Sequence, residues 1–205
     1  SFDNSSPVQS DLQKDWSGNI TVDSELNNSN DVVIEVYAQD NSLNSSVNSE
    51  QIKIDITKPV IRISYDNNNP DSGKYYNNSR TATIDVTERN FNPENIETKI
   101  TNTDGVVPSL SNWSYEEGTG NNDNTTYTAT ILYDADGDYT FDINYSDLAG
   151  NQCEEKIYSS GTSNATEFTI DKTIPVIEVS YNNNSFENDK YFKQDRTATI
   201  SIKEH

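Results

Sequence analysis

The stretch GDYTFDINY, residues 137–145, alternates aromatic or aliphatic side chains with polar ones along its length. Successive side chains of a β-strand point to opposite faces, so the alternation predicts a strand with Phe141 and Ile143 on its buried face. The turn-forming segment 134–137 (DADG) separates it from a second alternating run, residues 127–133. We expect these two runs to pair as a hairpin, because the interval between them is short and rich in turn residues.

Similar short runs lie on both sides of this stretch. Residues 81–87 (TATIDVT) alternate strictly, and residues 60–65, 96–101 and 167–171 are further runs of β-forming residues. Asn, Ser, Asp and Gly fill the intervals, as turns require, and no run has helical periodicity. Short strands without helices predict an all-β fold, a β-sandwich. The residues expected to form one apolar layer between its sheets are Ile84, Val86, Phe141, Ile143 and Phe168.

The chain also repeats its own sequence with a period of 116 residues. The segment RTATI at residues 80–84 returns unchanged at residues 196–200, and Pro59-Val60-Ile61 returns at residues 175–177. A period of this length matches one small domain and is too long for a solenoid unit. The sequence therefore predicts sandwich repeats in tandem.

The repeat also predicts domain boundaries. Residues 31–40 (DVVIEVYAQD) resemble residues 138–147 at a distance of 107 positions, so the first part of the chain corresponds to the back of a repeat. We expect the chain to be an internal fragment, because it shows no initiator methionine, signal peptide or anchor. Its predicted parts are a rear half-repeat (1–56), a complete repeat (57–171) and a front half-repeat (172–205).

Composition limits the classes of partner. The net charge is −20, whereas phosphate binding needs a basic face, so nucleic acid and anionic membrane surfaces are not expected partners. There is no apolar run of about 18 residues, so no membrane insertion is expected. The single cysteine, Cys153, excludes an internal disulfide. Secreted animal domains of this size commonly carry one, so cysteine poverty favours an exported bacterial protein.

One local pattern makes the sandwich more specific. Gly137-Asp138-Tyr139-Thr140-Phe141 resembles the immunoglobulin pattern Gly-x-Tyr-x-Cys, with Phe141 in the place of the second cysteine. In such domains the tyrosine forms a corner hydrogen bond to nearby backbone, and Tyr139 is the candidate for that role. The alternative is a tyrosine that lies flat on a sheet.

Four longer motifs extend the resemblance to the whole chain: Asp171-Lys172-Thr173-x-Pro175-Val176-Ile177, RTATI at 80–84, Glu88-Arg89-Asn90-Phe91 and Tyr145-Ser146-Asp147-Leu148-Ala149-Gly150-Asn151. Together they resemble bacterial immunoglobulin-like repeats of large Gram-positive surface proteins. The resemblance implies immunoglobulin-like β-sandwich repeats in tandem, exported to the cell surface. The first copy departs from the pattern, because Asp40-Asn41-Ser42-Leu43-Asn44 lacks the glycine, which leaves the geometry of that turn open.

The linkers between repeats carry a proline. The segments 56–59 (ITKP) and 172–175 (KTIP) join the last strand of one repeat to the first strand of the next. Proline fixes its own φ and biases the preceding residue toward extended backbone, so we expect stiff junctions that suit a rod. The alternative is a proline that only starts a strand.

Calcium is the one cofactor that the residues suggest. Asp147 and Asn151 flank a tight turn, and Asp55 and Asp171 lie in the linkers, so oxygen ligands could gather at a junction. The alternative is that Asp147 caps the turn through backbone amides, with Gly150 at positive φ. The Asp134-x-Asp136-Gly137 segment lacks the spacing of a calcium loop, and we interpret it as a hairpin turn.

No catalytic constellation is expected. The only histidine is His205, Cys153 has no histidine partner, and no nucleophile, phosphate-loop or metal-ligand motif is present. The chain is therefore predicted not to be an enzyme.

Two functions remain open from the sequence. The first is a stalk or adhesin module on a bacterial cell surface, in contact with neighbouring repeats. The second is specific binding of a host protein or glycan, including superantigen-like binding of immunoglobulin variable regions. Tyrosines suit such contacts because they give large area at low entropy cost. The candidates are Tyr65, Tyr75, Tyr76 and Tyr115, which could equally pack against the sandwich or the next domain.

Overall fold

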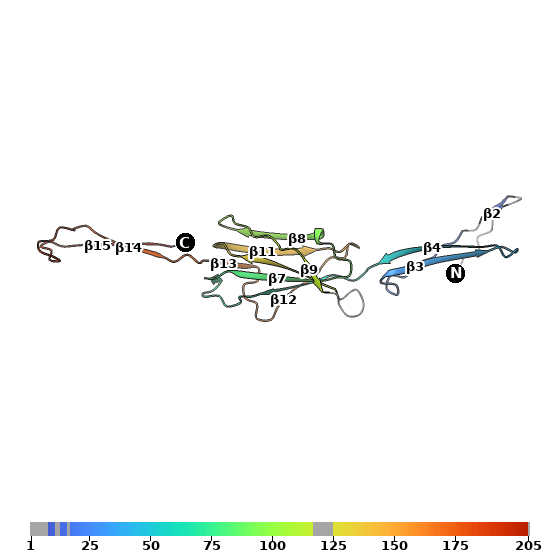
Figure 1. The fold of residues 1–205 in the computed structure, drawn as a ribbon, viewed down its shortest axis with the longest axis horizontal. Coiled ribbons are helices and arrows are strands. Elements are labelled where there is room, and N and C mark those ends of the chain that lie inside the picture. Colours follow the sequence, from blue (N-terminus) through green and yellow to red (C-terminus); the bar gives the residue numbers. More distant parts are fainter. Residues whose placement is uncertain (1–7, 11–12, 16, 117–124, 205) are drawn as a thin grey trace.

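The computed structural model describes residues 8–10, 13–15, 17–116 and 125–204, and its centre is a sandwich of two β-sheets (Figure 1). The strands of the sandwich are β5 (Val60–Tyr65), β6 (Tyr75–Tyr76), β7 (Arg80–Thr87), β8 (Ile96–Asn102), β9 (Ser114–Glu116), β10 (Thr126–Tyr133), β11 (Gly137–Tyr145), β12 (Lys156–Tyr158) and β13 (Glu167–Ile170), with one 3-10 turn, η1 (Pro93–Asn95). The flanking strands are β1 (Val8–Ser10), β2 (Gln13–Asp15), β3 (Ser29–Gln39), β4 (Ser45–Ile54), β14 (Val176–Tyr181) and β15 (Ala198–Lys203).

The strand order is that of an immunoglobulin sandwich. One sheet has the order β12-β5-β7-β10-β9 and the other β6-β13-β11-β8. Strands β5, β7, β10 and β9 take the places of A, B, E and D, and β8, β11 and β13 take those of C, F and G. Neighbours are antiparallel except for β12 with β5 and β6 with β13. The predicted all-β sandwich is confirmed.

The core is the predicted apolar layer. Ile84, Val86 and Ile143 are fully buried, and Phe141 and Phe168 are no more than 2% exposed. The alternation that predicted these strands returns as alternating burial along β7 and β11, because each strand turns one face to the opposite sheet.

Tyr139 forms the predicted corner. Its hydroxyl donates to the backbone oxygen of Ala135 at 2.8 Å, and its ring stacks on Phe168 with centroids 5.5 Å apart. The corner bond fixes the entry of the chain into β11, and the ring fills core volume beside it.

The predicted hairpin over residues 134–137 is wrong. Strand β10 pairs with β7 and β9, whereas β11 pairs with β8 and β13, so the segment between them crosses from one sheet to the other. Alternation shows which residues face the core but does not show which runs pair. The carboxylates of the crossing segment bind the C-terminal linker instead: Asp136 accepts from the Lys172 backbone amide at 3.0 Å, and Asp134 contacts the Lys172 ammonium at 2.8 Å.

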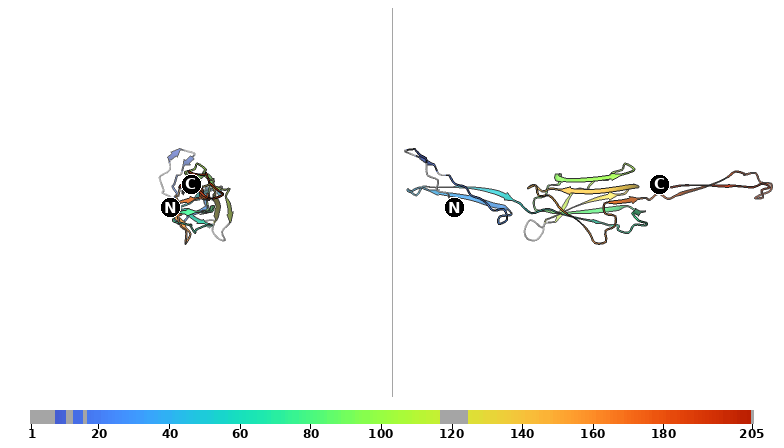
Figure 2. Two further views of the ribbon diagram at one scale, coloured as in Figure 1. Left: turned by 90° about the vertical axis from the view of Figure 1, so that its left-hand side faces the viewer. Right: turned by 180° about the vertical axis from the view of Figure 1, so that it is seen from behind.

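Two hairpins extend from opposite ends of the sandwich, β3–β4 at one end and β14–β15 at the other (Figure 2). Strand β14 pairs Val176 with Lys203, which is the β5–β7 register shifted by 116 positions. The sequence repeat thus extends to the hydrogen-bonding register.

The C-terminal hairpin lacks the opposite sheet that covers its counterpart. Ile61 and Ile63 of β5 are fully buried, whereas the corresponding Ile177 and Val179 of β14 are 64% and 52% exposed.

Candidate metal centre

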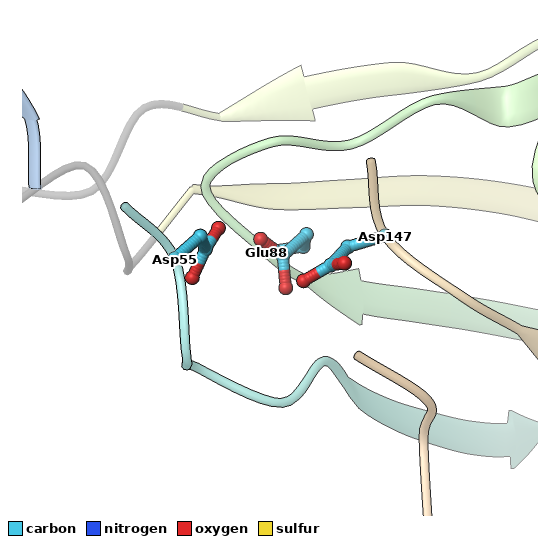
Figure 3. A group of neighbouring side chains, drawn as sticks. All are labelled: Asp55, Glu88 and Asp147. Carbon is cyan, nitrogen blue, oxygen red and sulfur yellow. The ribbon is translucent and has the colours of Figure 1, made fainter. Parts of the chain in front are cut away.

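Three carboxylates meet at the end of the sandwich from which the β3–β4 hairpin extends. Asp55 comes from the linker before β5, Glu88 follows β7, and Asp147 follows β11 (Figure 3). One carboxylate oxygen from each lies within 4.8 Å of the other two. Within the described ranges this is the only group of three or more acidic, histidine or cysteine side chains with that spacing.

All three carboxylates are withdrawn from water. The Asp55 side chain is 2% exposed, and the residues Glu88 and Asp147 are 1% and 3% exposed. Two like charges 4.8 Å apart repel by about 3.5 kcal/mol at an effective dielectric constant of about 20. Such a cluster needs a compensating charge or a proton.

Asp147 is held by its own turn. Its Oδ1 accepts the backbone amides of Ala149 at 2.9 Å and Asn151 at 2.8 Å, and Gly150 has φ +88°. The alternative to calcium binding by Asp147, in which its carboxylate caps the turn through backbone amides, is confirmed. The Asp147 Oδ2 also accepts the side-chain amide of Asn151 at 2.8 Å. The turn therefore fixes the position of the carboxylate at the junction.

The turn without the glycine has the same geometry. Asp40 Oδ1 accepts the amides of Ser42 at 2.8 Å and Asn44 at 2.9 Å, and Leu43 takes the place of the glycine with φ +70°. A side chain at positive φ is strained, so the Asp–Asn frame imposes this conformation even on leucine.

Glu88 has one satisfied oxygen and one without a partner. Its Oε1 accepts the backbone amides of Arg89 at 2.7 Å and Asn90 at 2.9 Å. Its Oε2 is buried and has no hydrogen-bond partner. Burial raises the pKa of the Glu88 carboxyl, the negative charges of Asp55 and Asp147 add to that rise, and the two amides oppose it.

Asp55 is paired with Arg89. The guanidinium lies 2.9 Å from Asp55 Oδ1, and the side chains are 5% and 2% exposed. Asp55 also accepts the side-chain amide of Asn90 and, at 3.0 Å, the backbone amide of Thr57. One guanidinium beside three carboxylates leaves an excess of two negative charges when all three are ionised.

The four predicted metal ligands separate into two groups. Asp55, Asp147 and Asn151 come together, and the Asn151 side-chain amide donates to the Asp55 backbone oxygen at 3.0 Å. Asp171 lies at the opposite end, between β13 and β14, where it occupies the position that Asp55 has before β5. Glu88 was not predicted, although its return as Glu204 at the repeat distance was a signal that could have found it.

The tyrosine candidates also separate. Tyr65 and Tyr76 are 6% and 0% exposed and pack against the buried guanidinium of Arg80, so their predicted contact with a partner is wrong. Tyr75 and Tyr115 are 50% and 63% exposed, and binding through them stays a prediction. Tyr65 and Tyr76 are buried because every second side chain of a β-strand points into the core.

Comparison with protein families, curated proteins and solved structures finds no match to this chain. In the parts of the chain that the structure describes, no helix is long and apolar enough to cross a membrane.

Proposed function

We propose that the chain is part of a non-catalytic rod of tandem immunoglobulin-like domains on a bacterial cell surface, a stalk or adhesin module that holds other domains away from the cell. The observation that carries the proposal is the fastening of the N-terminal linker to the sandwich. A rod holds other domains at a fixed distance from the cell only if its junctions do not bend freely. The proposed function therefore requires a linker that is fixed to the sandwich.

Arg89 fastens the linker from the sandwich side. Its guanidinium donates to the side-chain oxygen of Asn28 at 2.6 Å and to the backbone oxygen of Ile54 at 3.3 Å, in addition to its ion pair with Asp55. Asn28 and Ile54 belong to the N-terminal hairpin region and Arg89 to the loop after β7. One buried side chain thus ties the hairpin, the linker and the sandwich together, and solvent screens these contacts little.

Further bonds hold the linker on its other sides. The Asn28 side chain donates to the Thr57 hydroxyl at 2.8 Å, and the Lys58 ammonium pairs with Glu154 of the sandwich. Pro59, at the end of the linker, is buried. The proline restricts the backbone while the hydrogen bonds restrict the direction in which the hairpin leaves.

Support for the bacterial surface comes from the sequence resemblance and from the single cysteine. Support for a non-catalytic role comes from the sequence, which has no catalytic motif and one cysteine, Cys153, whose thiol donates to the backbone oxygen of Glu155 at 3.2 Å. The sole histidine, His205, lies outside the described residues.

The experiment is a distance measurement across the junction. Spin labels at Ser42→Cys, in the exposed β3–β4 turn, and at Glu94→Cys, in η1, are introduced into a Cys153→Ser background. Pulsed electron resonance should give one narrow distance distribution. Arg89→Ala should broaden it, because three residues of the linker region, Asn28, Ile54 and Asp55, lose their donor. Arg62→Ala, on the exposed face of β5, should leave it narrow. A broad distribution in the unsubstituted junction would refute the rod.

A further inference from the structure

We propose that the cluster of Asp55, Glu88 and Asp147 is a calcium site in which the cation joins the linker to two loops of the sandwich. The inference does not rest on the rod function, because a domain of any role can hold a cation at this position. It goes beyond the rod by placing a ligand at the junction.

Charge is the first reason. The cluster holds three carboxylates and the guanidinium of Arg89. The side chains of Arg89 and Asp55 are 5% and 2% exposed, and the residues Glu88 and Asp147 are 1% and 3% exposed. Buried charges are found paired or bound to metal ions, because removing them from water is costly. An excess of two negative charges is what one divalent cation balances.

The second reason is independent of the clustering. Glu88 is 99% buried, and its Oε2 has no hydrogen-bond partner. The other oxygen of the same carboxylate is fixed by two backbone amides, so the direction of Oε2 is fixed as well. Buried polar atoms in folded proteins nearly always have a partner, and each exception needs an explanation. A bound cation supplies the partner that the protein does not.

Spacing and ligand type favour calcium. Calcium binds oxygen ligands at about 2.3–2.6 Å, so oxygens around one ion can lie up to about 5 Å apart. The three carboxylate oxygens lie within 4.8 Å of one another. They come from three separate segments, and calcium accepts such irregular arrangements, whereas magnesium demands a near-ideal octahedron and keeps its waters.

The cluster also has neutral groups that can complete the coordination. The side-chain amides of Asn90 and Asn151 now donate to Asp55 and Asp147. Turning such an amide over exchanges its nitrogen for its oxygen at almost the same place, so either side chain can present an oxygen to a cation. Water would supply the remaining ligands, as in other calcium sites.

The test uses the full chain after treatment with a chelator. Calorimetric titration with calcium chloride should show one site per chain, and the melting temperature should rise with calcium concentration by mass action. Glu88→Gln should weaken binding at least about tenfold, because affinity depends on the charge of the ligands. Glu97→Gln, the same change at an exposed position on β8, should bind as the unsubstituted chain does.

A second readout avoids reliance on a variant that could fail to fold. In the unsubstituted chain, calcium should shift the amide resonances of Arg89 and Asn90, which donate to Glu88, and magnesium should shift them less. The proposal is overturned if millimolar calcium gives neither heat, melting shift nor resonance shift. It is also overturned if a folded Glu88→Gln binds calcium as tightly as the unsubstituted chain. A failed calcium test with a narrow interspin distance would leave the rod standing.

Discussion

Replacing Gly137 by alanine should destabilise the sandwich at the start of its central strand. Gly137 has φ +132°, and an added Cβ would lie 2.0 Å from the Asn102 side-chain oxygen. Asn102 cannot easily withdraw, because its amide group donates to the backbone oxygen of Val106 at 3.0 Å and accepts the Asp104 amide at 2.9 Å. Backbone strain of about 1–3 kcal/mol, together with about 1 kcal/mol for each lost hydrogen bond, predicts a cost of about 3–5 kcal/mol.

The assay is urea unfolding followed by the fluorescence of Trp113, which packs against Phe91, in a Trp16→Phe background. The matched control repeats Gly137→Ala in Asn102→Ala. There the clash is absent, so the cost of the alanine should fall to the backbone strain alone, about 1–3 kcal/mol. Equal costs in both backgrounds would contradict this prediction, because the Asn102 contact would then contribute nothing.

Three further predictions concern the corner, the junction turn and alkaline stability. Tyr139→Phe should cost about 1 kcal/mol in urea unfolding, because only the bond to Ala135 is lost, and an unchanged midpoint would contradict the corner. Gly150→Leu should lower the free energy of unfolding by about 1–2 kcal/mol and leave the fold intact. Leu43 already adopts a positive φ at the equivalent position, and no atom lies within 4 Å of a Cβ added at Gly150. Loss of folding would contradict this prediction. Burial raises the pKa of Tyr145 to about 12, so its contribution to stability is constant below about pH 10 and is lost as pH rises toward 12. Between about pH 10 and 12 the free energy of unfolding of Tyr145→Phe should fall less steeply than that of the unsubstituted chain, by up to about 1.4 kcal/mol per pH unit. Parallel curves of unfolding free energy against pH would contradict the raised pKa of Tyr145.

Much of the sandwich could be predicted from local sequence. Alternation in residues 81–87 and 137–145 gave strands whose buried faces are those observed, because period-two burial follows directly from strand geometry. Strand pairing could not be predicted in this way. The short interval between β10 and β11 is compatible with either a hairpin or a crossing between sheets, and only packing of the whole core decides between them.

The candidate site was predicted in part for a similar reason. Asp147 and Asn151 are a local pair, so their turn was accessible from spacing alone. Glu88 follows a strand far away in the chain, and its approach to Asp55 depends on the order of strands in the sheets. Asp171 and Asp55 lie in equivalent linkers of the repeat, and equivalent positions lie one domain apart, so the two do not meet in one site.

The burial of the tyrosines shows a limit of composition-based reasoning. Tyr65 and Tyr76 surround the fully buried Arg80, whose guanidinium donates to backbone oxygens of Asn67 and Asn164 at 2.8 Å each. An arginine and two tyrosines in polar surroundings are typical of a surface, yet here the rings and carbonyls enclose the cation.

The junction around Arg89 fixes the N-terminal hairpin to the sandwich in the proposed rod. The most direct measurement is of amide residual dipolar couplings in one alignment medium, collected for β3–β4 and for β5–β13. A single alignment tensor should fit both sets with the same magnitude, because the two parts tumble as one body. Couplings of the hairpin that shrink to a small fraction of those of the sandwich would contradict it.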